Sequence, residues 1–230
     1  DGTDCRFYLN PSNMKVQAMD IATIGGEVFL FAVGKWGRNS AFVSYNLTKG
    51  IMGPVHNFGR NGNSSSPRYN FRHTWRIAVN SDASILYAAR YHLFGFDLTK
   101  VGDVYQITGG GNAICSRCYT ATNSGNLDTQ LVPVSGIDVS PEDDNILYIT
   151  SNYRHVVQKL SLDGTQRGLS VVARAGTGSR EFGMNTEDSG DLEASKVRFN
   201  YPNSIHVTAD KILVGSYSGT VDEFNENLFT

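Results

Sequence analysis

The segment VVARAGTGSREFG, residues 171–183, has the spacing most suggestive of chemistry, because Gly176-Thr177-Gly178 follow a run of strand-forming residues. Glycine-rich turns after a strand hold phosphate groups in nucleotide-binding proteins. A dinucleotide-binding turn also requires a third glycine, where this chain has Glu181, and a helix directly after it. The Gly-Lys-Ser/Thr triplet of a Walker loop is missing as well. We therefore interpret Gly176 and Gly178 as residues that turn the backbone sharply out of a strand.

The cysteines form the second candidate for chemistry, since Cys115 and Cys118 have Cys-x-x-Cys spacing and Cys5 is the third cysteine of the chain. A redox pair requires a helix N-terminus that stabilises its thiolate, and this pair lies in a loop after an expected strand. A structural zinc site requires four ligands, and the chain has no second pair. The pattern favours a disulfide, within the loop or from one of the two to Cys5, over free thiols or metal and redox chemistry.

The histidines and the densest acidic segment show no metal-binding spacing. Residues 142–145, Glu-Asp-Asp-Asn, lack the alternating acids and the glycine of a calcium loop. We expect this segment to form an exposed hairpin tip. No two histidines have His-x-x-x-His spacing, and no Gly-x-Ser-x-Gly elbow of a hydrolase is present. The histidines are His56, His73, His92, His155 and His206.

The composition excludes some classes of protein. The 230 residues contain 40% hydrophobic residues, which is typical of a globular chain. Because 20 Lys and Arg face 22 Asp and Glu, the charge gives no support for a nucleic-acid partner. No apolar run is long enough for a membrane span.

Two features favour an extracellular or cell-surface protein. Asn46 and Asn63 begin Asn-x-Ser/Thr triplets and are candidate glycosylation sites. The chain opens at Asp1 without a Met, which is typical of a mature or trimmed product.

A repeated unit organises the chain. Each copy has an apolar strand, a polar turn, a second apolar strand and an alternating third strand. The copies align at isoleucines about 60 residues apart, which are Ile21, Ile77, Ile137 and Ile205. The second strands read VFLFA, ILYAA, ILYIT and ILVGS, and two units continue into a fourth strand at 103–110 and 169–176. Crossover helices between the strands are missing, which argues against a parallel α/β sheet.

This pattern predicts an all-β fold, a β-propeller of four-stranded antiparallel blades. A two-sheet sandwich is the main rival, but it does not predict sequence similarity between units. We expect residues 1–230 to form one domain, either a four-bladed ring, in which residues 5–10 supply the last outer strand, or part of a larger propeller. The blades are expected at approximately 19–50, 75–110, 136–176 and 204–230.

The last two units resemble the NHL-repeat β-propellers. The resemblance rests on a Gly-x-Gly pair, a polar insert with Gly-Asp, an Ala-x-x-x-Phe-like segment, a proline and an Ile/Val strand. The matching residues are Gly176, Gly178, Gly190, Asp191, Ala194, Phe199, Pro202 and Ile205. The resemblance is strongest over 169–224 and implies a propeller that mediates interactions. Related propellers include an amidating lyase and lactonase-like hydrolases, but no position here matches their catalytic residues.

The sequence therefore favours a non-catalytic propeller that binds another protein or assembles with itself, without a cofactor. The contacts are expected in three inserts, 48–73, 109–133 and 176–201, because loops on a propeller rim vary without disturbing the core. Candidate contact residues are Tyr69, Phe71, Arg72, Arg117, Tyr119, Arg180 and Phe182. The alternative is a propeller enzyme, a lyase or lactonase-like hydrolase, with a metal ion in the central channel. His206, on a first strand, would face that channel.

Overall fold

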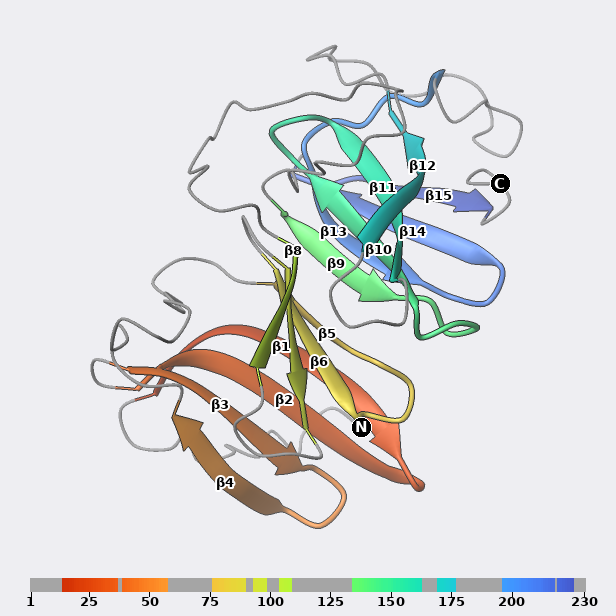
Figure 1. The fold of residues 1–230 in the computed structure, drawn as a ribbon. Coiled ribbons are helices and arrows are strands. Elements are labelled where there is room, and N and C mark those ends of the chain that lie inside the picture. The colour runs from red at the N-terminus through yellow and green to blue at the C-terminus, as the bar shows by residue number, and fades with distance from the viewer. Residues whose placement is uncertain are drawn as a thin grey trace. The chain divides into compact units, whose positions relative to one another are not determined.

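A computed structural model shows an all-β chain of antiparallel sheets (Figure 1). It divides into two compact units, Asp1–Trp75 and Arg76–Thr230, which are described separately below. The structure describes the following residues: 14–36, 39–57, 76–89, 93–98, 104–108, 134–162, 169–176, 196–217 and 219–225.

The first unit contains sheet 1, in which four strands pair in chain order. The strands are β1 (Met14–Ile24), β2 (Glu27–Trp36), β3 (Asn39–Asn46) and β4 (Ile51–Asn57). Gly25 and Gly26 have φ of 56° and 81° and form the two-residue turn between β1 and β2, as a type I′ hairpin requires. On one face, the Phe31 and Phe42 rings stack with centroids 6.0 Å apart.

Strand β4 corrects the sequence interpretation of this unit. The sequence assigns residues 51–57 to the interaction insert 48–73, beyond the blade at 19–50, yet they pair with β3. In this pairing Met52 lies opposite Tyr45 and Val55 opposite Val43, with a register shift between the two pairs.

The second unit contains three sheets, each with its strands in chain order. Sheet 2 comprises β5 (Arg76–Val79), β6 (Ile85–Ala89), β7 (Leu93–Asp97) and β8 (Val104–Thr108). Sheet 3 comprises β9 (Gly136–Val139), β10 (Ile146–Ser151), β11 (Val156–Leu162) and β12 (Leu169–Ala175). Sheet 4 comprises β13 (Pro202–Val207), β14 (Lys211–Ser216) and β15 (Val221–Asn225). The predicted second strands and both predicted fourth strands are therefore confirmed.

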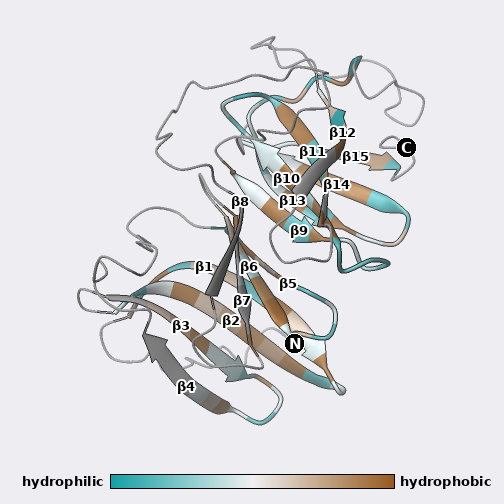
Figure 2. Ribbon diagram, viewed as in Figure 1, coloured by the Kyte–Doolittle hydropathy of each residue, from teal (hydrophilic) through white to brown (hydrophobic). Residues whose placement is uncertain are grey.

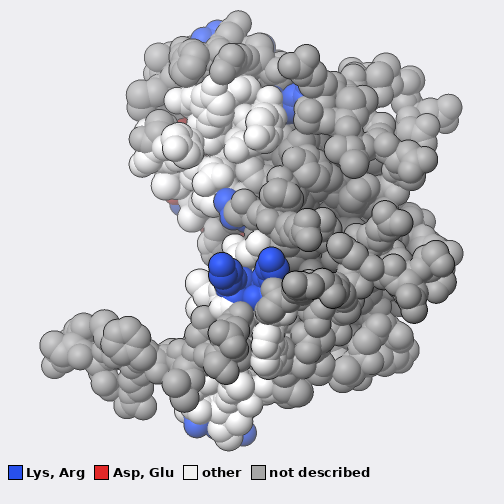
Figure 3. Space-filling model, turned by 90° about the vertical axis from the view of Figure 1, so that its left-hand side faces the viewer, with Lys and Arg blue, Asp and Glu red and all other residues white. Residues whose placement is uncertain are grey.

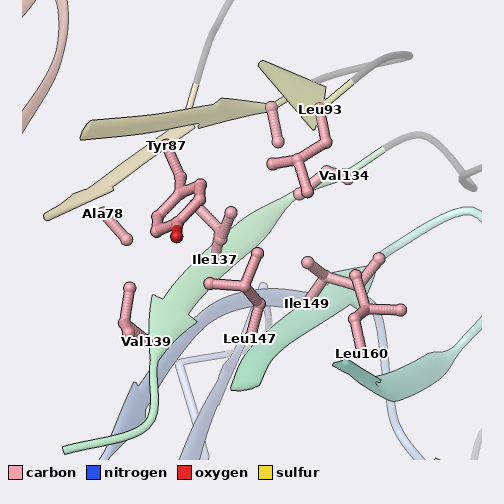
Figure 4. Close-up of a cluster of buried hydrophobic side chains, with 10 residues drawn as sticks. Ala78, Tyr87, Leu93, Val134, Ile137, Val139, Leu147, Ile149 and Leu160 are labelled. Carbon is pink, nitrogen blue, oxygen red and sulfur yellow. The ribbon is translucent and has the colours of Figure 1, made fainter. Parts of the chain in front are cut away.

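The sheets of the second unit pack face to face through alternating side chains. Leu147 and Ile149 of β10 face sheet 2, in a cluster that Tyr87 completes from β6 (Figure 4). Between them in the sequence, Tyr148 points to the other face of sheet 3 and packs with Phe224 of sheet 4. Sheet 3 is thus buried on both faces. In Figure 2, the brown, hydrophobic residues lie within strands, and several turns between strands are teal. This stacking buries the alternating apolar residues that defined the repeat.

Gly176 confirms the architectural interpretation of the glycine loop. Its φ is +110°, which side chains rarely adopt, and a Cβ at this position would meet the carbonyl oxygen of His155. The buried His155 also contacts the segment just before β13, since its Nδ1 lies 3.0 Å from the carbonyl oxygen of Phe199. Gly176 and Phe199 are therefore held against the same histidine, and Gly176 marks the exit from β12. Gly178 lies outside the described residues.

Candidate functional site

The first strands of sheets 2, 3 and 4 lie side by side in the second unit. Strand β9 contacts both β5 and β13. Because the strands of each sheet alternate in direction, the start of each first strand lies at the same end as the hairpin after the second strand. We call four residues at this end the rim: Arg76, Tyr153, Asn203 and Tyr217.

Ser135, just before β9, makes several buried hydrogen bonds at this end of the strands. Its buried hydroxyl donates to the carbonyl oxygen of Pro202 at 2.6 Å, lies 3.0 Å from the Thr150 hydroxyl and accepts from the Asn152 amide at 3.0 Å. Since the Ser135 hydrogen goes to Pro202, the Thr150 hydroxyl donates to Ser135. All of the hydrogen-bonding capacity of Ser135 Oγ is used: the bonds with Thr150 and Asn152 lie within sheet 3, and the bond to Pro202 joins sheet 3 to sheet 4.

Arg76 extends the connection to sheet 2. The Nε of Arg76 donates to the carbonyl oxygen of Ser135 at 2.5 Å, and its Nη2 lies 3.4 Å from Oδ1 of Asn203. One guanidinium at the start of β5 thus reaches the starts of β9 and β13. No carboxylate of the described residues forms an ion pair with it.

Two tyrosines stand out at the same end. Tyr153 and Tyr217 occupy equivalent hairpins after β10 and β14 and are 72% and 82% exposed. The Tyr217 amide donates to the Tyr201 carbonyl at 3.0 Å, and Asn152, next to Tyr153, is bound to Ser135. Both backbones are therefore fixed while the rings remain accessible to a partner.

Further along the first strands, Asp138 of β9 connects sheets 3 and 4. Its Oδ1 accepts from the Val139 amide at 2.9 Å, and its Oδ2 accepts from the Val207 amide at 2.8 Å and lies 3.0 Å from Nδ1 of His206. Burial raises the pKa of the Asp138 carboxyl, although the two amides and His206 act in the opposite direction. Both oxygens are occupied, so this carboxylate holds the sheets together.

His206 lies on the first strand of its sheet, as expected, and its side chain is 69% exposed. Because the Asp138 carboxylate accepts a hydrogen bond, Nδ1 of His206 carries the hydrogen and Nε2 points away from this partner. The sequence identified His206 as a candidate but not its partner, since Asp138 is far from it in the chain.

The acidic segment 142–145 forms a hairpin tip, as expected, but it also has a structural role. Asp144 accepts from the Ser81 amide and hydroxyl, both at 2.9 Å, and thereby links sheet 3 to sheet 2. Among the described residues, no group of three or more His, Cys, Asp or Glu is placed to hold a metal ion.

Most residues nominated from the sequence fall outside the described ranges. This applies to Asn63, Cys5, Cys115, Cys118, Tyr69, Phe71, Arg72, Arg117, Tyr119, Arg180 and Phe182. Asn46 is described: it is buried at the end of β3, where its Nδ2 donates to Oε2 of Glu27 at 2.6 Å and its Oδ1 accepts from the Lys49 amide at 2.9 Å. A glycan on Asn46 would have to be accommodated at this buried position, and its attachment stays a prediction.

Figure 3 shows where charged groups of the described residues lie on one face of the molecule. In the view of Figure 3, Lys and Arg form small separate groups and no continuous basic band runs over the described residues. The described part of the chain also contains no helix long and apolar enough to cross a membrane.

The rim tyrosines were missed because sequence reasoning looked for contacts only in the long inserts. A signal was present: Tyr91, Tyr153 and Tyr217 each follow a second strand of the repeat. Tyr91 lies outside the described residues. The interblade role of Arg76 had no comparable signal, because its partners are distant in sequence.

No protein-family model matches the chain, and no curated protein matches it. Solved structures do. Hydrazine synthase from Kuenenia stuttgartiensis aligns with 97% of this chain and 49% of its own at 11% identity, with a TM-score of 0.52. An auxiliary nutrient binding protein from Bacteroides thetaiotaomicron aligns with 91% of this chain and 47% of its own at 14% identity, with a TM-score of 0.54.

Both similar structures are β-propeller-like, and the antiparallel sheets of this chain are consistent with the same type of fold. The chain has a propeller-like fold. It spans about half the length of these two proteins.

Proposed function

We propose that the chain is a non-catalytic, NHL-like β-propeller that mediates binding to another protein, or assembly with copies of itself, in an extracellular or surface protein. The observation that carries this proposal is the pair of exposed tyrosines, Tyr153 and Tyr217, on equivalent hairpins of one rim. Tyrosine and arginine are the residue types that contribute most at protein interfaces, and Arg76 lies at the same end.

The fixed backbone of the rim also supports binding. Hydrogen bonds to Ser135 and Tyr201 hold the two tyrosine hairpins, so that little order has to be gained when a partner docks. By contrast, the buried acid of the first strands, Asp138, is occupied by three donors within the protein. Its role as an interblade link favours a scaffold over a catalytic carboxylate.

A double variant, Tyr153→Ala with Tyr217→Ala, tests the rim. Proteins recovered with the purified chain are quantified by mass spectrometry, and self-association is measured by light scattering. A partner, or an oligomer, should be retained by the wild type and lost from the double variant. Val172→Ala removes an exposed apolar side chain from β12 and serves as the control. Equal recovery with all three proteins would contradict a role for the rim.

The extracellular assignment rests on the two sequons, and the predicted disulfide would accord with it. Secretion of the protein from a eukaryotic host, followed by intact mass with and without a glycosidase, tests Asn46 and Asn63 separately through Asn→Gln variants. Peptide mapping under non-reducing conditions identifies any bond among Cys5, Cys115 and Cys118. An unglycosylated protein with three free thiols would contradict the assignment.

One observation favours the enzyme alternative. Carboxylates commonly orient the histidines that bind catalytic metals, and Asp138 orients His206 in this way. A lyase or lactonase-like hydrolase would require a metal ion bound through Nε2 of His206 together with further ligands. Metal analysis of the purified protein tests this: a stoichiometric ion that is lost in His206→Ala would overturn the non-catalytic proposal.

A further inference from the structure

The guanidinium of Arg76 has donors that its described partners do not use. Nε is bound to the Ser135 carbonyl and one Nη2 hydrogen points to Asn203, which leaves the Nη1 hydrogens and the second Nη2 hydrogen. Arg76 is half-buried, and no Asp or Glu in the described part of the chain pairs with it. Arginines that are shielded from water are usually paired with an anion, so the guanidinium of Arg76 is positioned to bind one.

Asn203 adds a second donor beside Arg76. Because a guanidinium only donates hydrogen bonds, the amide oxygen of Asn203 must be the atom that faces it. The NH₂ group of Asn203 then points elsewhere, and no described residue accepts from it. The unused hydrogens of Arg76 and the NH₂ group of the neighbouring Asn203 are therefore donors that no described residue takes up.

The position of Arg76 is set before any ligand arrives. The hydrogen bond from Nε to the Ser135 carbonyl orients the guanidinium, and Ser135 is itself held by the Pro202 carbonyl and the Asn152 amide. The end of the guanidinium that carries Nη1 and Nη2 matches the two oxygens of a carboxylate. Phosphate sites more often combine several cations or use a helix N-terminus, and neither feature is present among the described rim residues.

We propose that Arg76 and Asn203 bind the carboxylate of an Asp or Glu in a partner peptide segment, with the rings of Tyr153 and Tyr217 contacting the residues around it. This inference rests on the proposed protein-binding function and names the chemistry of the partner. A peptide is favoured over a free carboxylate because the two exposed tyrosines supply apolar contact area that a small acid does not use.

The test is selection of a phage-displayed random peptide library on the immobilised wild-type chain, followed by synthesis of a selected peptide. We expect the selected sequences to share an Asp or Glu. Replacing it by Asn or Gln should weaken binding about tenfold or more, as the loss of a charge-assisted pair implies. Arg76→Gln should cause a similar loss, while Arg76→Lys should restore part of the affinity because it keeps the charge.

Lys211→Gln is the control for charge alone. Lys211 pairs with Glu223 at the opposite end of sheet 4, so its replacement should leave peptide affinity unchanged. The change of Glu to Gln within the peptide tests the pairing without altering the protein, which covers the case that Arg76→Gln does not fold.

The other outcomes separate the two proposals. Selected peptides without a shared acid, whose binding is lost in the tyrosine double variant, would overturn the carboxylate inference and keep the rim function. Peptides whose binding depends on neither Arg76 nor the tyrosines would overturn both. If succinate binds with the same Arg76-dependent affinity as the peptide, the ligand is a small acid and the peptide assignment is wrong.

Discussion

Two polar regions of the second unit lie at and beside the first strands, and their hydrogen bonding differs. The first, which we call the seam, consists of Ser135, Asp138, Thr150, Pro202 and Val207, and it joins sheets 3 and 4. The second is the rim of Arg76, Tyr153, Asn203 and Tyr217. In the seam each polar side chain is hydrogen-bonded within the protein, whereas the rim has unused donors on Arg76 and exposed tyrosine rings.

The difference separates stability from recognition. A polar group that is buried and fully hydrogen-bonded contributes to the fold, and its removal leaves a partner unsatisfied. A group with free donors near the surface costs little to the fold but can gain a partner on binding. Variants of the seam should therefore change the free energy of unfolding, and variants of the rim should change binding.

The largest effect on stability is expected from Asp138→Ala. Its removal leaves the amides of Val139 and Val207 without their acceptor, which should lower the free energy of unfolding by about 2–3 kcal/mol. Urea denaturation followed by circular dichroism measures this change. Asp210→Ala, at an exposed hairpin, should change stability by less than about 0.5 kcal/mol. Equal effects of the two variants would show that the seam is not a structural link.

Ser135→Ala should have the next largest effect. The variant removes the acceptor of the Asn152 amide and the donor to the Pro202 carbonyl, and water has little access to this buried position. We expect a loss of about 1–2 kcal/mol in the same denaturation experiment. Ser135→Thr retains the hydroxyl and is the matched comparison, because recovery of stability would assign the loss to hydrogen bonding.

A pH dependence should come from Asp138. Burial raises its pKa in the folded state, so the folded protein binds this proton more tightly than the unfolded chain does. The contribution of Asp138 to stability should therefore increase as the pH falls through the folded-state pKa toward the unfolded value. Stability of the wild type minus that of Asp138→Asn, measured from neutral to acidic pH, should rise in that direction. A flat difference would show that the carboxyl is not perturbed.

The smallest effect on stability is expected from the rim. Tyr153→Ala and Tyr217→Ala remove rings that are largely in solvent, so each should change the free energy of unfolding by no more than about 0.5 kcal/mol. Thermal melts of the two variants measure this. A loss comparable to that of Ser135→Ala would mean that these rings support the fold, and the contrast between rim and seam would fail.

Sequence reasoning was most successful for the strands. The apolar runs ILYAA, ILYIT and ILVGS, repeated after polar turns, identified three second strands, because this pattern is local in the sequence. Strand β4 was missed because it follows a short turn at Gly50 and was assigned to an insert. The predicted blades stay compatible with the sheets, while closure of a ring stays a prediction.

The candidate sites were harder to predict. His206 was singled out for its place on a first strand, but its partner Asp138 lies on another sheet and could not be found from spacing. The same holds for Arg76, whose contacts with Ser135 and Asn203 form only when three sheets come together. Hydrogen bonds between distant segments leave no periodic trace in a single sequence.

The isoleucines of the repeat show that the local sequence predicts the strands but not the burial of their side chains. Local periodicity by itself placed Ile21, Ile77 and Ile137 on first strands, and all three lie there. Their environments differ, however: Ile77 and Ile137 are each 6% exposed, whereas Ile21 is 58% exposed. A strand is determined by its own residues and turns, but the burial of its side chains and the partners of its polar groups depend on which surface packs against it. The sequence thus determined the strands and their repeat. Only the tertiary structure determined that the polar groups of the seam are hydrogen-bonded within the protein, while the rim has unused donors and exposed rings.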